Sequence, residues 1–336
     1  MTEPIRAGVL GLGSSVPDQV LTNADLEKMV KTSDEWIRTR SGICERRIAP
    51  KETAASDLAL LAAREALSDA GLQGEDLDLI IVATVSSDML FPNTSCLIQR
   101  DLGAKNAAAY DLSAGCSGFI YALAQATQSV ITGFHRLVLV VGVDILSRIT
   151  NWEDRSTCVL FGDGAGAVVL GPVSDGTGFQ AHYLGADGNG ADHIKILAGG
   201  SRCPASHETV DRKDHYLKMR GNEVFKFAVR IIPEAVEEVL RRAGLAKAEI
   251  DVYLPHQANI RIIEAAAKRL DLPLDRFYIN VDRFGNTSAA SIPIALAELY
   301  RAGRLKYADK ILLVGFGAGL TWGASILFWS KNGSAV

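Results

Sequence analysis

Cys116 is the residue of this sequence best placed to act as a nucleophile. It lies in the turn AGCSGF, between Gly115 and Gly118 and directly before the apolar helical pattern of residues 119–130. A helix start offers free N–H groups and a favourable dipole, both of which stabilise a thiolate, and glycines let a ligand approach the backbone. The other possibility is a buried structural thiol, which is the usual state of a free cysteine. The other four cysteines lack this context and are expected to be structural.

His256 and Asn286 are two further polar residues at turns. His256 follows an apolar run that Pro255 closes, and an apolar helical stripe comes after it. A histidine at such a turn can be a general base, a hydrogen-bond donor or only a local cap. Asn286 stands in FGNTSAAS, before an Ala-rich helical stretch. An asparagine there usually caps the helix, but its amide N–H₂ can also face a developing negative charge.

The elements that must position these residues alternate between short runs of branched apolar side chains and helical stretches, which predicts an α/β fold with buried strands. Three strand and helix units occur twice in the same order, which predicts two halves of similar topology. Alternation of strand and helix alone would not show a repeat, because every α/β chain has it. The prediction of two similar halves therefore rests on the regular offsets between the matching units. The offsets are 173, 170 and 173 residues, for Asp78 with Asp251, Cys116 with Asn286, and Gly142 with Gly315.

The turn-forming segment GPVSDGTG, residues 171–178, marks the seam between the halves, which we place at 1–174 and 175–336. Cys116 and Asn286 occupy matching strand-to-helix turns, so pseudo-twofold packing would bring them together. His256 would lie nearby, because open α/β sheets hold their sites at the carboxyl ends of strands. The sequence therefore predicts one site built from both halves.

Two other segments are rich in glycine. GFGAGLTWG, residues 315–323, has no GxGxxG that opens a helix, so it favours a tight turn that brings backbone N–H groups to the site over a dinucleotide loop. GVLGLGSS near the N-terminus lacks the helix and acidic residue that a nicotinamide cofactor needs. We interpret FGDGAGAVVL, residues 161–170, as a hairpin without chemistry.

Composition excludes several classes of protein. With 336 residues, 48% of them hydrophobic, the chain is not mainly disordered, and its net charge of −4 argues against nucleic-acid binding through bulk charge. The apolar runs are far shorter than the roughly 20 residues of a membrane-spanning helix. The N-terminus lacks the apolar core of a signal peptide, so a cytoplasmic location is expected. Five scattered cysteines without a CxxC pair predict neither a disulfide framework nor a metal site.

The motifs AGCSGF, PHQANIRI, FGNTSAAS and GFGAGLTWG together resemble the β-ketoacyl-acyl carrier protein synthase III family of the thiolase superfamily. The resemblance runs from GLGSSVPDQVLTN to the last strand. It implies a thiolase-like, five-layered αβαβα fold of two similar halves with pseudo-twofold symmetry. It also implies a decarboxylative Claisen condensation of a short acyl-CoA with malonyl-acyl carrier protein, which releases CoA and CO₂ and initiates type II fatty-acid synthesis.

The resemblance gives the turn residues distinct roles. Cys116 matches the acylated nucleophile, while His256 and Asn286 match the pair that stabilises the carbanion formed when the malonyl group loses its carboxylate. The backbone amides of Cys116 and Ala318 would form the oxyanion hole, although the family usually has glycine where Ala318 stands. One thiol shared by two half-reactions implies ping-pong kinetics. Thiolases and elongating synthases have histidine in place of Asn286, which argues against both.

The resemblance also assigns contacts with substrates and partners. The residues matched to CoA are Trp36, Arg40, Arg155, Gly221 and Asn259. The acidic carrier protein would dock on Gln257, Ala258, Asn259, Ile260 and Arg261, together with Lys268. The acyl pocket would include Phe91, Leu146, Thr157 and Phe316, and Phe91 would also reach across a homodimer interface.

The expected partners are therefore acyl-CoA, malonyl-acyl carrier protein and a second copy of the chain, with no nucleic acid, membrane, metal or cofactor, since acyl-CoA is a substrate. Two alternatives stay open. One is a condensing enzyme of specialised metabolism with a different primer or acceptor. The other is a non-catalytic CoA-binding protein, which would keep Trp36 and Arg40 but would not need the three turn residues together.

Overall fold

The computed structural model describes residues 5–174 and 176–331. Its first half builds a five-stranded sheet in the order β1 (Arg6–Ser15), β7 (Asp163–Val173), β6 (Val138–Ile145), β4 (Leu79–Ala83), β5 (Ala108–Leu112). The strands β6, β4 and β5 are parallel, and β7 runs antiparallel to both β6 and β1. Every residue of β4 and β6 is buried, as expected where helices cover both faces of a sheet.

The second half repeats this arrangement. Its sheet has the order β8 (Gly178–Ala186), β13 (Thr321–Phe328), β12 (Lys310–Gly317), β11 (Val252–Pro255), with β11 and β12 parallel and the other pairs antiparallel. Tyr253 of β11 makes a further parallel bridge to Phe277, in the place that β5 takes in the first sheet. The two sheets therefore share strand order and direction, as the offsets in the sequence predicted. The boundary that we place between residues 174 and 175 stays a prediction.

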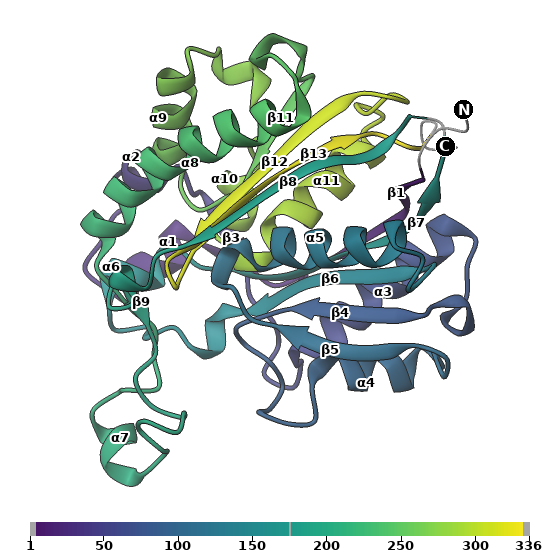
Figure 1. Cartoon of the computed structure of the whole chain (residues 1–336). Helices are drawn as coiled ribbons and strands as arrows, with labels where there is room; N and C mark the ends of the chain where they lie inside the picture. Colours follow the sequence, from purple (N-terminus) through teal and green to yellow (C-terminus); the bar gives the residue numbers. More distant parts are fainter. Residues whose placement is uncertain (1–4, 175, 332–336) are drawn as a thin grey trace.

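Helices and sheets stack in five layers (Figure 1). The helices α5 (Gly118–Ile131) and α11 (Ser291–Arg301) lie between the sheets. The outer layers are α3 (Ala55–Ala70) and α4 (Thr94–Asp101) on the first sheet, and α8 (Gly221–Ala243) and α9 (Ile260–Leu270) on the second. The central helices are apolar on most sides, whereas α8 and α9 bury one face, as their positions require. The predicted αβαβα architecture is confirmed.

Shorter elements join the layers and surround one end of the sheets. They are β2 (Val20–Thr22), α1 (Asn23–Glu27), α2 (Asp34–Ser41), β3 (Glu45–Arg47), α6 (Arg155–Cys158), β9 (Ile194–Lys195), α7 (His207–Asp211), β10 (Lys218–Met219) and α10 (Val281–Phe284). Single 3₁₀ turns cover Gly74–Asp76, Gly115–Ser117, Leu146–Arg148, Gly188–Gly190, Lys247–Glu249, Leu274–Arg276 and Ser288–Ala290. The loop that carries α7 projects away from the sheets (Figure 1). Within the described residues, no helix combines the length and apolarity needed to cross a membrane.

The predicted hairpin at residues 161–170 is wrong, because residues 163–170 belong to the single strand β7. The glycines there serve close packing instead of a turn. A Cβ atom on Gly166 would lie 2.7 Å from Cβ of Pro293, in the central helix α11. Glycine in this strand therefore lets α11 approach the first sheet closely.

Candidate active site

Cys116 stands where the sequence predicted, between the end of β5 at Leu112 and the start of α5 at Gly118. Gly115 has φ +55°, a left-handed conformation that glycine adopts without strain. Burial, together with the negative charge of Asp144, raises the pKa of the Cys116 thiol to about 12, while the Ser288 hydroxyl acts in the opposite direction. Desolvation therefore opposes the thiolate that the helix start was expected to favour.

His256 directly follows β11, and its backbone N–H donates to the carbonyl of Val314 at 2.7 Å. The side chain is buried, with 2% exposed, and Nδ1 lies 2.6 Å from Oγ of Ser291. The ring of Phe316 meets the imidazole edge to face at 5.7 Å. Burial lowers the pKa of His256 to about 3, so the ring is neutral at physiological pH.

Asn286 is held by three hydrogen bonds. Its backbone N–H donates to Leu160 at 2.8 Å, and its carbonyl accepts from Gly162 at 3.0 Å. The side-chain oxygen Oδ1 accepts from the backbone N–H of Ser288 at 2.9 Å. Asn286 therefore caps a turn, as the alternative interpretation of the sequence expected, but this turn is the short 3₁₀ turn that precedes α11. With Oδ1 occupied in this way, the Nδ2 donor is the part of the amide left to face a ligand.

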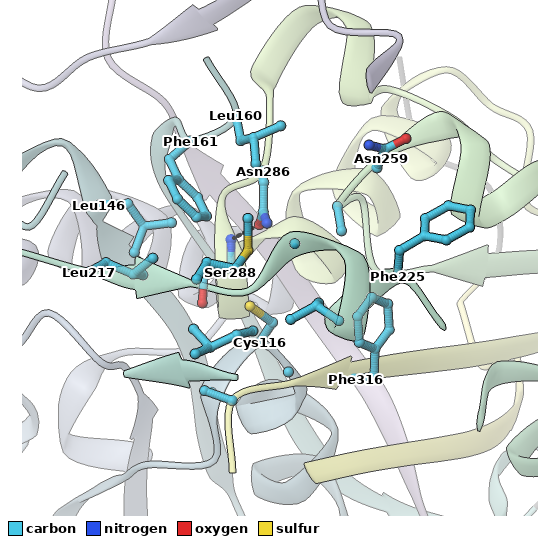
Figure 2. A pocket seen from close by; sticks show the side chains of 18 of the residues that line it. Cys116, Leu146, Leu160, Phe161, Leu217, Phe225, Asn259, Asn286, Ser288 and Phe316 are labelled. Atoms are coloured by element: carbon cyan, nitrogen blue, oxygen red, sulfur yellow. Dashed lines mark hydrogen bonds between the residues drawn. The ribbon is translucent and has the colours of Figure 1, made fainter. Parts of the chain in front are cut away.

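These three residues line one cavity of about 580 Å³, to which both halves of the chain contribute. Figure 2 shows Cys116, Asn286 and Ser288 together, with Leu146, Phe161 and Leu217 on one side and Phe225 and Phe316 on the other. The cavity has the size and the mostly apolar lining that are typical of a site for a small organic ligand. The predicted convergence of the Cys116 and Asn286 turns on one site is thus present in the structure.

The glycine-rich turn after β12 packs directly against the nucleophile turn. A Cβ atom on Gly115 would lie 2.7 Å from the backbone nitrogen of Ala318, and one on Gly317 would lie 2.4 Å from the backbone nitrogen of Cys116. The hydroxyls of Ser117 and Thr321, 2.8 Å apart, join the two turns. Ala318 lines the cavity, so the backbones of both turns border the space in front of the thiol.

Replacing Gly317 by alanine is expected to slow the acylation that the sequence predicts at Cys116 by about tenfold or more, because the new methyl group must push the two turns apart and small displacements of reacting groups are costly. The rate of acyl transfer, followed by intact-protein mass spectrometry, measures the effect. Gly188→Ala is the matched control, since a Cβ atom there meets nothing within 4 Å. Equal rates for the two variants would contradict the proposed role of this contact.

The mouth of the cavity holds most of the residues assigned to CoA. Trp36, Arg40, Gly221 and Asn259 all line the cavity. Asn259 caps α9 by accepting from the backbone N–H of Arg261, and its Nδ2 donates to the carbonyl of Arg40 at 2.9 Å. Arg155 lies outside this lining, but its guanidinium stacks over the indole of Trp36, 4.6 Å from the ring centroid.

Three residues that were predicted to contact the carrier protein or the acyl group lie elsewhere in this structure. Gln257 is buried, with 1% exposed, and its amide bonds Pro255, Tyr278 and Asn280, so it supports the His256 segment and has no surface for a carrier protein. Thr157 is buried outside the cavity, bonded to the carboxylate of Asp154. Phe91 is 82% exposed and also outside it, so in one copy of the chain it forms no part of an acyl pocket.

The other predicted docking residues are at or near the surface. Ala258 and Arg261 line the mouth, Ile260 is half-buried in the contact between α9 and α2, and Lys268 is exposed. Within the described residues, neither Arg261 nor Lys268 forms an ion pair.

Several lining residues escaped the sequence analysis. One of them is Ser288, which stands in FGNTSAAS, where small polar residues after Asn286 were the available signal. The sequence analysis also missed Ser291 of the same motif, which does not line the cavity but contacts the imidazole of His256. The apolar wall gave no local signal, because it comes from segments far apart in the chain: Leu160, Phe161, Leu217, Met219 and Phe225. The part of the chain that the structure describes contains no group of three or more histidine, cysteine or acidic side chains placed to hold a metal.

Comparison with known proteins points to a single family. The family model "3-Oxoacyl-[acyl-carrier-protein (ACP)] synthase III" matches residues 110–188, and the model of its C-terminal part matches residues 240–329. The beta-ketoacyl-[acyl-carrier-protein] synthase III of Caldanaerobacter subterraneus subsp. tengcongensis is 61% identical over 98% of this chain and 100% of its own.

Solved structures are similar over the same length. The Thermus thermophilus synthase III has a TM-score of 0.90 at 50% identity and covers 96% of this chain and 99% of its own. A priming β-ketosynthase from the R1128 polyketide pathway has a TM-score of 0.89 at 36% identity, with 98% of each chain covered. The higher identity to the synthases III does not favour the specialised-metabolism alternative.

Proposed function

The chain belongs to the 3-oxoacyl-[acyl-carrier-protein] synthase III family and is an acyltransferase, and we propose that it works through an acyl-Cys116 intermediate. The reaction is the decarboxylative Claisen condensation of a short acyl-CoA with malonyl-acyl carrier protein. Its products are 3-oxoacyl-acyl carrier protein, CoA and CO₂, and it initiates fatty-acid synthesis. The observation that carries the residue assignment is the single cavity shared by Cys116, His256 and Asn286.

In the first half-reaction, the sulfur of Cys116 attacks the thioester carbon of acyl-CoA. The negative charge that develops on the thioester oxygen is stabilised by the backbone amides of Cys116 and Ala318, whose turns touch. This chain has Ala318 where the family usually has glycine, and alanine retains the backbone amide. The Cys116 thiol loses its proton and CoA leaves as a thiol, so the step is neutral overall. The start of α5 favours the sulfur as its negative charge develops, against the cost of burial.

In the second half-reaction, malonyl-acyl carrier protein enters the site and loses CO₂. The resulting carbanion delocalises onto the thioester oxygen, where neutral His256 and the Nδ2 group of Asn286 donate hydrogen bonds. Neutral donors stabilise this charge without supplying a readily released proton that would quench the carbanion. The carbanion then attacks the acyl group on Cys116, which forms the new carbon–carbon bond and breaks the bond to sulfur. The Cys116 thiolate that leaves takes up a proton from solvent, and this restores the resting thiol.

The direct test is incubation of the protein with a series of acyl-CoAs, from acetyl through branched to medium-chain, followed by intact-protein mass spectrometry and then by addition of malonyl-acyl carrier protein. A gain of one acyl group, lost again when 3-oxoacyl-acyl carrier protein and CO₂ appear, is the expected result. Preference for acetyl or short branched donors fits initiation of fatty-acid synthesis. Acylation without turnover by malonyl-acyl carrier protein would contradict the proposed acceptor.

Trp36 is proposed to stack with the adenine of CoA. Trp36→Ala is expected to raise the KM for acyl-CoA by about tenfold, a magnitude typical for the loss of aromatic and cation–π stacking. Acyl-pantetheine, which has no adenine, should acylate parent and variant equally well. Phe134→Ala serves as the control, because Phe134 is an exposed aromatic residue outside the cavity. An equal loss with both donors would rule out a contact specific to the nucleotide.

Carrier-protein docking is proposed for the exposed face of α9, with Ala258, Asn259 and Ile260 at its start and Arg261 and Lys268 as its charges. These two cations have no carboxylate partner in the described part of the chain, so they are available to an acidic partner. Arg261 also lies at the mouth, with its guanidinium 5.5 Å from the ring centroid of Phe225.

Arg261→Glu and Lys268→Glu are expected to raise the KM for malonyl-acyl carrier protein by about tenfold each at low salt. Lys268→Glu should leave acylation by acyl-CoA unchanged, because Lys268 does not line the cavity. Steady-state rates at several salt concentrations measure this, since the difference should shrink as salt rises. Lys51→Glu is the matched control, because Lys51 is also exposed and does not line the cavity. If Lys51→Glu has the same effect, docking does not depend on this face.

A homodimer is proposed in which Phe91 contributes to the partner's acyl pocket, in line with its 82% exposure and its place outside the cavity of its own chain. The cytoplasmic location expected from the sequence stays a prediction.

A further inference from the structure

We infer that Ser291 is a positioning residue that holds His256 in the tautomer with the proton on Nε2. The inference rests on the proposed function, because it defines what His256 contributes to the second half-reaction. Ser291 is the first residue of the central helix α11, and both it and His256 are buried.

The hydrogen bonds around Ser291 decide which ring nitrogen carries the proton. Its Oγ accepts from the backbone N–H of Gln257 at 3.3 Å, and a backbone amide can only donate. The same Oγ lies 2.6 Å from Nδ1 of His256. In the described residues no other acceptor is within hydrogen-bond distance of this hydroxyl. The hydroxyl proton of Ser291 can therefore be donated only to Nδ1 of His256.

The opposite tautomer would leave a buried group unsatisfied. If Nδ1 carried the proton, Ser291 would accept two hydrogen bonds, and its own O–H would have no acceptor. A buried donor without a partner costs free energy that the observed arrangement avoids. The doubly protonated ring would have the same defect, and burial of His256 already disfavours it.

The consequence is that Nε2, the nitrogen not facing Ser291, presents an N–H to the cavity. His256 then matches Asn286, whose Oδ1 is likewise occupied on the protein side, by Ser288, so that its N–H₂ is free. Both residues would be fixed as donors before the substrate arrives. An imidazole in this state cannot take the proton of Cys116 at Nε2, so removal of Ser291 should affect condensation and spare acylation.

The tautomer is measured by ¹⁵N NMR of the whole, ligand-free protein labelled at histidine, with the His256→Gln spectrum used to assign the ring signals. The expected result is a neutral ring with the proton on Nε2. A proton on Nδ1 would overturn the inference. This measurement needs no folded Ser291 variant and no turnover, so it decides the tautomer even if condensation with malonyl-acyl carrier protein is not observed, a result that would count against the proposed function instead.

The kinetic test compares Ser291→Ala with Ser291→Thr, which keeps the hydroxyl. Ser291→Ala should lower condensation by about tenfold to a hundredfold, as loss of a group that orients a functional histidine does elsewhere, with acylation within about twofold of the parent. Ser291→Thr should restore most of the condensation rate. Ser325→Ala is the matched control, because the buried Ser325 lies 2.7 Å from Nδ1 of another histidine, the half-buried His182, outside the cavity. Equal losses in both half-reactions, or condensation by Ser291→Ala at the parent rate, would overturn the inference.

Discussion

Replacing Cys116 by alanine is expected to abolish acyl-enzyme formation and to lower condensation by at least about a thousandfold, because no other nucleophile borders the cavity at the same turn. Intact-protein mass spectrometry after incubation with acetyl-CoA gives the first result directly. The parent gains one acyl group and the variant gains none. Stability should change little, because the substitution removes a single sulfur atom from a residue that is only partly buried.

The control for this experiment is Cys96→Ala, which removes an exposed thiol outside the cavity. Cys96→Ala should acylate and condense at the parent rate. This result would show that the acyl group gained by the parent is not attached to the exposed thiol of Cys96. An acyl adduct of equal stoichiometry in Cys116→Ala would show that another residue is the nucleophile.

The second large effect is expected at Asn286, and only in one half-reaction. Asn286→Ala removes a donor to the developing charge, a loss that typically costs about a hundredfold to a thousandfold in rate. Acylation of Cys116 should continue near the parent rate, because it depends on the backbone amides of the other turn. Pre-acylated protein mixed rapidly with malonyl-acyl carrier protein measures the condensation step alone.

Asn286→Asp separates this electronic effect from a structural one. The aspartate retains an oxygen to accept from the N–H of Ser288 at the observed 2.9 Å, so the turn before α11 keeps its support. The N–H₂ donor is replaced by a negative charge beside the forming carbanion, so condensation should fall at least as far as in Asn286→Ala. If Asn286→Asp condensed at the parent rate, the proposed donor role would be wrong.

The sequence predicted the fold and the meeting of the Cys116 and Asn286 turns, while the catalytic roles of these residues and of His256 stay predictions. The Gly-flanked turn before residues 119–130 correctly placed Cys116 at a helix start, since tight turns and helix starts depend on neighbouring residues. The offsets of the repeat predicted that the Cys116 and Asn286 turns would share one cavity, because strands of equal order and direction bring matching turns together.

What the sequence could not provide depends on packing between distant segments. The orientation of Gln257 is an example, because the pattern around PHQANIRI does not tell that its amide bonds Tyr278 and Asn280 inside the protein. The glycines of β7 are a second example, because their sequence is typical of a turn and only the packing of α11 against β7 explains them. The high pKa of Cys116 has the same origin, since the desolvation that causes it requires both halves of the chain.

The pseudo-twofold arrangement also has an electrostatic consequence. It directs the N-terminal ends of two central helices, α5 beside Cys116 and α11 beside Asn286, toward the same cavity. Each helix end has a partial positive charge, so peptide dipoles give the cavity a positive potential without a cationic side chain beside the thiol. The pKa values near 3 for His256 and near 12 for Cys116 mean that neither side chain titrates near neutral pH. The site can thus stabilise two successive anionic transition states while the resting side chains of Cys116 and His256 are both uncharged.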